Sequence, residues 1–157
     1  MPFAKQDEYF MKIALEFAKK AFLMDEVPVG CVIVKDQMIV GKGYNLVEKK
    51  QDATCHAEMI ALKQAKKKLG NWRLNGCVVY STLEPCMMCA GAFLLSRIDK
   101  LIYAAKDVRH GAHTSFINVF EKKHPTHSIE IVSGLFEMEA KQLLKTFFQQ
   151  RRVSKLQ

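Results

Sequence analysis

Apolar residues recur along the chain with two different periods, and the two periods alternate. Residues 7–22 carry apolar side chains three and four positions apart, which predicts an amphipathic helix with Asp7 as its N-cap. Two runs rich in β-branched residues follow, at 29–34 and 38–44, and the polar residues between them predict a hairpin. The first third of the chain therefore reads as one helix followed by two antiparallel strands.

The same alternation continues to the end of the chain. Periodicity and end signals predict helices over 55–69, 85–96 and 136–152, and strands over 78–82, 100–105 and 129–132. Asp52 and Thr54 are expected N-caps of the first of these helices and Gly70 its left-handed end, while Pro85 is expected at the first position of the second. The polar residues 106–128 are expected to form a loop with one helical turn near 117–120. This order predicts an α/β fold with a central mixed sheet covered by helices on both faces.

Composition narrows the class of protein. The 157 residues contain no repeat or linker, so we expect one domain over residues 1–157. The start of the chain does not resemble a signal peptide, and the longest apolar run, 86–95, is shorter than the roughly 18 residues that span a membrane. Five cysteines without a secretory signal favour a cytoplasmic protein whose thiols bind metal or react. A net charge of +8 favours a polyanionic partner.

Candidate chemistry is concentrated at the starts of two predicted helices. Cys86 and Cys89 are three positions apart, so they share a helical face, and a helix N-terminus favours the thiolate form that binds metal. His56 adds an imidazole from the other helix, which completes three ligands of the kind that zinc takes. Cys55 is an alternative fourth ligand. Because no second Cys or His pair is present, an open catalytic site is favoured over a closed structural one.

Glu58 follows the histidine by two positions. Two thiolates and a neutral imidazole cancel the charge of Zn²⁺, so the metal alone acidifies its water less than an all-histidine site would, and a nearby carboxylate can take the proton and return it. Side chains two positions apart do not share a helical face, so His56 and Glu58 converge only if the chain bends where the helix begins. The alternative for Glu58 is a solvated acid that stabilises the first helical turn.

The segments 56–58 (HAE) and 85–89 (PCMMC) resemble the signature of the zinc-dependent cytidine and deoxycytidylate deaminases. Flanking residues narrow the resemblance to bacterial tRNA adenosine deaminases, and it extends over about residues 7–152. These flanking residues are 25–30, Asn45, 83–92, 96–98, 147–148 and 151–152.

The resemblance implies hydrolytic deamination of adenosine to inosine at the wobble position of a tRNA anticodon. It implies one zinc ion per subunit, held by His56, Cys86 and Cys89, with a hydroxide on zinc attacking C6 of adenine and Glu58 shuttling the proton. It also implies a three-layer α/β/α, cytidine-deaminase-like fold with a five-stranded sheet, and a homodimer with the active site at the subunit interface.

Four further residues are assigned to the substrate on the same basis. Asn45 would pair with the base edge, Val29 and Leu83 would form the pocket walls, and Asp107 would accept a hydrogen bond from a ribose 2′-OH. The alternatives are a turn asparagine for Asn45 and ordinary core positions for Val29 and Leu83. Lys106 stands where the family usually has arginine, which replaces a bidentate phosphate contact with a point charge.

Two other functions remain open from the sequence. A deaminase of small molecules, of the cytosine or guanine type, would use the same metal and acid–base groups. A zinc-stabilised RNA-binding module would hold the metal with four protein ligands and would not need Glu58. The net charge and the basic end of the last helix, residues 151–155, favour RNA, whereas Lys66–Lys68 serve equally well as a solvated helix end.

Overall fold

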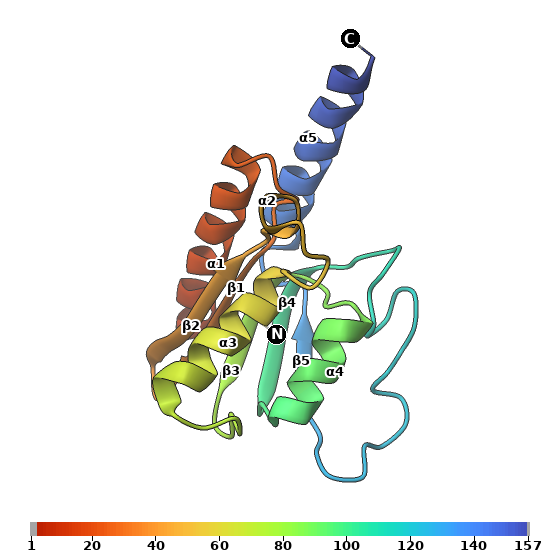
Figure 1. Cartoon of the computed structure of the whole chain (residues 1–157). Helices are drawn as coiled ribbons and strands as arrows, with labels where there is room; N and C mark the ends of the chain where they lie inside the picture. The colour runs from red at the N-terminus through yellow and green to blue at the C-terminus, as the bar shows by residue number, and fades with distance from the viewer. Residues whose placement is uncertain (1–2, 157) are drawn as a thin grey trace.

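A five-stranded sheet lies between two layers of helices in the computed structural model, which describes residues 3–156 (Figure 1). The elements in chain order are α1 (Lys5–Leu23), β1 (Gly30–Lys35), β2 (Met38–Tyr44), α2 (Val47–Lys50), α3 (Ala57–Leu69), β3 (Val78–Leu83), α4 (Met87–Ser96), β4 (Lys100–Ala105), β5 (Glu130–Ser133) and α5 (Glu137–Lys155). The predicted three-layer α/β/α arrangement is confirmed.

The sheet is mixed, as predicted, with the strand order β2-β1-β3-β4-β5. β1 runs antiparallel to both β2 and β3, whereas β3, β4 and β5 are parallel to one another. The predicted hairpin turns at Asp36 and Gln37, whose φ angles of 49° and 62° are those of the tight turns that suit the strand twist.

The two faces of the sheet carry separate cores. Ile33 packs with residues of α3 and α4 on one face, and its neighbours Val32 and Val34 pack with α1 and α5 on the other. This alternation follows from the two-residue period of a strand. A side chain at Gly43 of β2 would collide with the carbonyl oxygen of Ala57, so glycine there allows α3 to lie close to the sheet.

Three predicted helix starts are wrong. α1 begins after Ala4, and Asp7 lies in its first turn, where it accepts a hydrogen bond of 2.8 Å from the Tyr80 hydroxyl. α3 and α4 each begin two residues later than predicted, after the N-caps His56 and Cys86. Pro85 therefore precedes α4. The predicted end of α3 is correct, because its C-cap is Gly70 in the left-handed conformation with a φ of 62°.

The remaining differences lie in the connections. The short helix α2 was not predicted, and residues 117–120 do not form the expected helical turn. The long segment between β4 and β5 contains no helix or strand and runs past α4 from the end of β4 to the start of β5 (Figure 1). In the part of the chain that is described, none of the helices has the length and hydrophobicity needed to span a membrane.

Most of the residues assigned to metal binding, proton transfer or substrate contact lie at one end of the strands of the sheet. The pairings Gly30–Tyr44, Cys31–Ser81 and Leu83–Ala105 bring together the start of β1 and the ends of β2, β3 and β4. The N-termini of α3 and α4 lie at this end of the strands. The C-terminus of α3 lies at the opposite end, where Lys68 Nζ donates to the Ile39 carbonyl over 3.0 Å.

Candidate active site

His56, Cys86 and Cys89 come together in the fold. Nδ1 of His56 lies 3.6 Å from the Sγ atom of Cys86 and 3.6 Å from that of Cys89. The three donor atoms all lie within 4.8 Å of one another, and no other such group of metal-ligating side chains occurs within residues 3–156. One nitrogen and two sulfur donors fit zinc. Cys55 is not part of this group, so the arrangement leaves a position open.

Two of these donors occupy helix N-cap positions. His56 precedes α3 and Cys86 precedes α4, both with extended backbone, and neither side chain forms a capping hydrogen bond. Their side chains therefore remain free to meet each other, and the positive ends of two helix dipoles face the cluster. This local geometry favours negatively charged sulfur.

The sulfur atoms share one negative charge. Hydrogen bonds from Cys89 and His56 lower the pKa of Cys86 far below that of an ordinary thiol, and the contact with Cys86 together with burial raises the pKa of Cys89. The hydrogen bond with Cys86 also raises the pKa of His56. The cluster thus holds a thiolate at neutral pH, which is the form that binds a metal cation.

Glu58 lies against the same cluster. Its side chain is only 4% exposed, and its two carboxylate oxygens lie 3.5 Å from Cys89 Sγ and 3.4 Å from Ser81 Oγ. Because His56 stands outside the helix, the two side chains converge despite their spacing. The alternative of a solvated first-turn acid is wrong. Burial raises the pKa of Glu58, so the group can exchange a proton nearer neutral pH than an ordinary glutamate.

Asn45 lies buried at the end of β2 with an unused acceptor. Its side chain is 8% exposed, and its Oδ1 atom has no hydrogen-bond partner. Its backbone N–H donates to the Val29 carbonyl over 3.1 Å, so these two residues are neighbours. Val29 is buried, and Leu83 is half-buried at the end of β3 next to the Cys86 segment. A buried acceptor without a partner is costly, which favours a ligand that donates to it.

Asp107 begins the segment that follows β4. Its Oδ1 atom accepts hydrogen bonds from the backbone N–H groups of Arg109 and His110, at 3.1 and 3.2 Å. Its charge lies close enough to His56 to favour the protonated imidazole. One carboxylate oxygen thus shapes a turn, and Oδ2 lies 3.9 Å from the exposed His110 ring.

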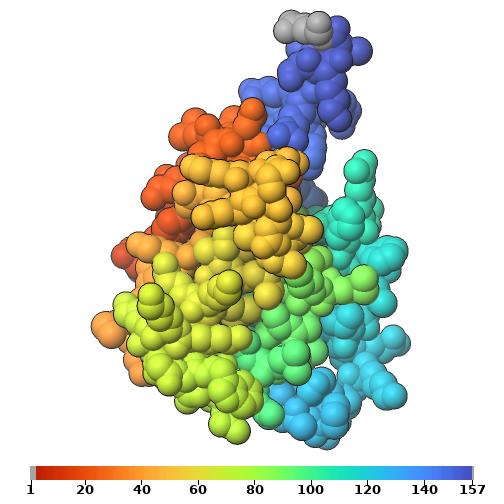
Figure 2. Space-filling model, in the orientation of Figure 1, coloured from red at the N-terminus to blue at the C-terminus, as the bar shows by residue number. Residues whose placement is uncertain are grey.

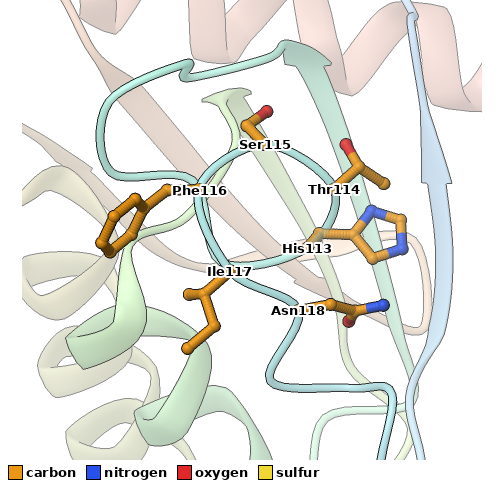
Figure 3. A pocket seen from close by; sticks show the side chains of 6 residues that line it. All are labelled: His113, Thr114, Ser115, Phe116, Ile117 and Asn118. Atoms are coloured by element: carbon orange, nitrogen blue, oxygen red, sulfur yellow. The ribbon is translucent and has the colours of Figure 1, made fainter.

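A cavity of about 410 Å³ lies in the same segment, and none of the metal-ligating residues lines it. It is lined by residues 113–118, and Figure 3 shows Phe116 pointing to the opposite side from His113 and Asn118. The His113 ring, one of the lining side chains, forms a 2.8 Å contact with the Tyr103 hydroxyl. The lining side chains do not converge, so this cavity does not form a second candidate site.

Sequence reasoning missed two buried acids near the site. Glu26, 1% exposed, accepts hydrogen bonds from the backbone of Lys49 at 2.7 Å and Glu48 at 3.3 Å, which anchors α2 between Asn45 and His56. Glu84 is equally buried, directly before Pro85. Burial opposes its ionisation, but hydrogen bonds from Ser115 and nearby backbone lower its pKa overall. Their only sequence signal is an acid beside apolar residues and proline.

The basic residues of α5 and those of α3 lie at opposite ends of the strands of the sheet. Arg151 Nη2 of α5 donates to the Asp25 carbonyl over 2.9 Å, which places the basic end of α5 near the start of β1 and hence at the edge of the site. Lys66–Lys68 lie at the C-terminus of α3, at the opposite end of the strands. Of the two candidate phosphate-binding groups, only the one on α5 lies on the side of the metal-ligating cluster.

Comparison with known proteins gives a consistent result. Residues 4–105 match the model of the cytidine and deoxycytidylate deaminase zinc-binding region. The chain is 43% identical over 150 residues to a tRNA-specific adenosine deaminase of Bacillus subtilis, with 96% of this chain and 93% of the relative covered. It is 46% identical to a tRNA-specific adenosine deaminase of Haemophilus influenzae, with 95% and 87% covered.

The fold is similar to a solved structure from work on A-to-I editing by tRNA:A34 deaminases at the wobble position of transfer RNA. The TM-score is 0.83 at 39% sequence identity, and the match covers 87% of this chain and 99% of the other. The similarity to these proteins therefore extends from the metal-ligating segments to nearly the whole chain.

Proposed function

The chain belongs to the cytidine and deoxycytidylate deaminase family, and we propose that it converts adenosine to inosine at the wobble position of a tRNA anticodon. The observation that carries the chemistry is the cluster of three metal donors with the buried Glu58 carboxylate beside it. The similarity to tRNA-specific adenosine deaminases over more than nine tenths of the chain supports the substrate. We take residues 1–157 as one such domain.

His56, Cys86 and Cys89 would hold the zinc ion of this family, and the open position leaves room for water. Bound zinc supplies a Lewis acid that lowers the pKa of that water. Three protein donors rather than four distinguish this arrangement from that of a zinc-stabilised binding module.

Glu58 is the proposed proton carrier. It would accept a proton from the water that attacks C6 of the base, deliver it to N1, and assist the departure of ammonia, so that adenosine and water give inosine and ammonia. Its raised pKa suits both directions of transfer. The contact with Ser81 Oγ, at 3.4 Å, supports its carboxylate while the proton moves.

Asn45 is the proposed contact to the base. Its free Oδ1 atom would accept a hydrogen bond from an N–H group of the purine, and its amide N–H₂ would donate to a ring nitrogen. Val29 and Leu83, which lie beside Asn45 and Cys86, would pack against the base. Asp107 would use its second oxygen to accept a hydrogen bond from a ribose 2′-OH, a group that DNA lacks.

The charge of the chain suits an RNA partner. Exposed cations gather at the edge of the site, from α2, from the start of the segment after β4, and from α5: Lys49, Lys50, Lys106, Arg109 and Arg152. Such side chains would contact phosphates and position the anticodon loop. The location of tRNA and the five free thiols favour the cytoplasm.

We propose a second copy of the chain as the partner of α4. Met87 and Leu95 are 53% and 69% exposed, and with Gly91 between them they are spaced by four residues along one face of the helix. Figure 2 shows α4, in green, at the surface of the molecule. An apolar helix face beside the Cys86 segment would become buried in a homodimer, and each active site would then lie at the interface.

The substrate assay decides between the candidate functions. The zinc-loaded protein is incubated with an anticodon stem-loop carrying adenosine at the wobble position, with the same stem-loop carrying guanosine there, and with free adenosine, cytidine and guanine. We expect inosine only in the first RNA, with release of ammonia. Turnover of a free base or nucleoside alone would favour a small-molecule deaminase, and binding of the RNA without any inosine would favour a binding module.

A further inference from the structure

The buried carboxylate of Glu84 is surrounded by hydrogen-bond donors from one loop. Its Oε2 atom accepts from the backbone N–H groups of His113 and Thr114 at 2.9 Å each and of Ser115 at 3.3 Å. Its Oε1 atom accepts from the N–H of Asp107 at 3.2 Å and from the Ser115 hydroxyl. Five donors from residues 107–115 thus converge on a side chain that is 1% exposed.

The loop is shaped to fit this carboxylate. A methyl group at Gly111 would overlap the Glu84 carboxylate carbon and Oε2, so the chain at this point has no space for a side chain. Next to it, the N–H of Ala112 donates to the Pro85 carbonyl over 2.9 Å. No lysine, arginine or histidine forms an ion pair with Glu84 among the described residues.

These contacts explain how a charge is tolerated in the interior. A buried carboxylate without a cation is stable only if several hydrogen bonds replace its water shell. Successive backbone N–H groups of the kind found at 113–115 form a concave anion site. Here the protein fills that site with its own carboxylate, so the donors of 113–115 are unavailable to an RNA phosphate.

The same residue joins two parts of the active site. Glu84 and Pro85 lead directly into the metal donor Cys86, and the loop held by Glu84 begins with Asp107, the proposed ribose contact. The N–H of Glu84 itself donates to the Ala105 carbonyl over 2.8 Å. The position of Asp107 relative to the metal donors therefore depends in part on contacts made by the Glu84 side chain.

We propose that Glu84 is a positioning residue that holds the 107–115 loop against the metal-donor segment and thereby sets the affinity for the RNA substrate, without taking part in proton transfer. This inference rests on the proposed function, because the loop contacts substrate only if the substrate is RNA bound at this edge. It predicts that loosening the loop weakens substrate binding while the chemical step is preserved.

The test compares Glu84→Gln, Gly111→Ala and Ser115→Ala with the wild type. Glu84→Gln replaces one acceptor oxygen by an amide N–H₂ group, which cannot accept from the backbone N–H groups that face it. Gly111→Ala disturbs the contact between the loop and the Glu84 carboxylate without changing the segment that carries Cys86 and Cys89. Ser115→Ala removes one donor of five and is the mildest change. Ser128→Ala, an exposed serine outside the loop, is the matched control. Zinc content, KM and kcat on the stem-loop, and amide hydrogen exchange are measured for each.

We expect KM to rise about tenfold for Glu84→Gln and Gly111→Ala, and about threefold for Ser115→Ala, with kcat within about threefold of wild type. Zinc content should stay at one per subunit, and the amides of 113–115 should exchange faster. Unchanged KM in all three variants, or a parallel loss of zinc and kcat in Gly111→Ala, would overturn the role of Glu84. Failure of the wild type to act on any stem-loop would instead overturn the proposed function.

Discussion

Glu58 and Cys89 touch each other, with 3.5 Å between the carboxylate Oε2 and the thiol Sγ. The acid–base group therefore lies directly beside a metal donor. Its position is set before any base enters, and Ser81 supports it from β3 at 3.4 Å. Preorganisation of this kind reduces the rearrangement needed at the moment of proton transfer.

Replacing Glu58 by glutamine should separate chemistry from metal binding. Glu58→Gln keeps the shape of the side chain but removes the proton acceptor, so we expect kcat to fall by about 10²- to 10⁴-fold. Zinc content, measured by mass spectrometry, should remain at one per subunit. Glu121→Gln, an exposed acid far from the cluster, is the control. Wild-type kcat in Glu58→Gln would contradict the assignment of Glu58 as the proton carrier.

A pair of cysteine variants should identify the metal ligands. Cys86→Ser removes a thiolate from the cluster and should lose both zinc and turnover. Cys55→Ser changes a neighbouring thiol that lies outside the group of donors, and it should keep both. Loss of zinc in Cys55→Ser would show that the site is closed by a fourth protein ligand.

Asn45→Ala should weaken recognition of the base. Removing one partner of a buried hydrogen bond typically costs 1–3 kcal/mol, so we expect kcat/KM on the stem-loop to fall by about 10- to 100-fold. Zinc content should not change, and the exposed residue Asn75 offers a matched Asn→Ala control. Wild-type kcat/KM in the Asn45 variant would mean that this asparagine only shapes the turn after β2.

Leu95→Lys should dissociate the proposed homodimer. A charge on the apolar face of α4 that the proposed dimer buries would be desolvated without a partner, so the dimer dissociation constant should rise at least about tenfold. Sedimentation of the wild type and the variant over a range of concentrations measures this. Leu23→Lys, which changes a leucine that is 83% exposed at the end of α1, should sediment as the wild type does. A monomeric wild type would refute the dimer.

Stability should depend on pH through His113. Burial lowers the pKa of this imidazole from its ordinary value of 6.5, so the unfolded chain binds a proton that the folded chain resists. The contribution of the neutral ring is present above pH 6.5 and is lost as the pH falls below that value. The difference in unfolding free energy between wild type and His113→Asn, measured in urea, should therefore be larger at pH 7.5 than at pH 5.5. An equal difference at the two pH values would contradict the contribution of His113 to the pH dependence of stability.

Hydrophobic periodicity predicted the layers of the fold correctly, but it did not predict the residues at which the helices begin. Ile33 and Val32 point to opposite cores, as alternation requires, and the apolar stripes of α1 and α3 face the sheet. The predicted caps of α3, Asp52 and Thr54, are wrong and Pro85 precedes α4, because His56 and Cys86 occupy the cap positions. Capping preference describes side chains that bond their own backbone, whereas these side chains face a common metal site.

Buried acids mark the limit of sequence reasoning at this site. Glu26 and Glu84 are stabilised by backbone N–H groups that belong to segments 22 to 31 residues away. Backbone donors leave no trace in residue types, so neither partner set is visible in the sequence. The donors of the metal cluster were found because histidine and cysteine spacing is itself chemical information.

The long connection from β4 to β5 provides neither a metal donor nor the proton carrier, although it borders both. Its residues outside 107–115 include none of those assigned to metal binding or proton transfer. The proposed ribose contact Asp107 and the reacting groups therefore lie on separate segments of the chain, so recognition at this position can change without altering the residues that carry out the reaction.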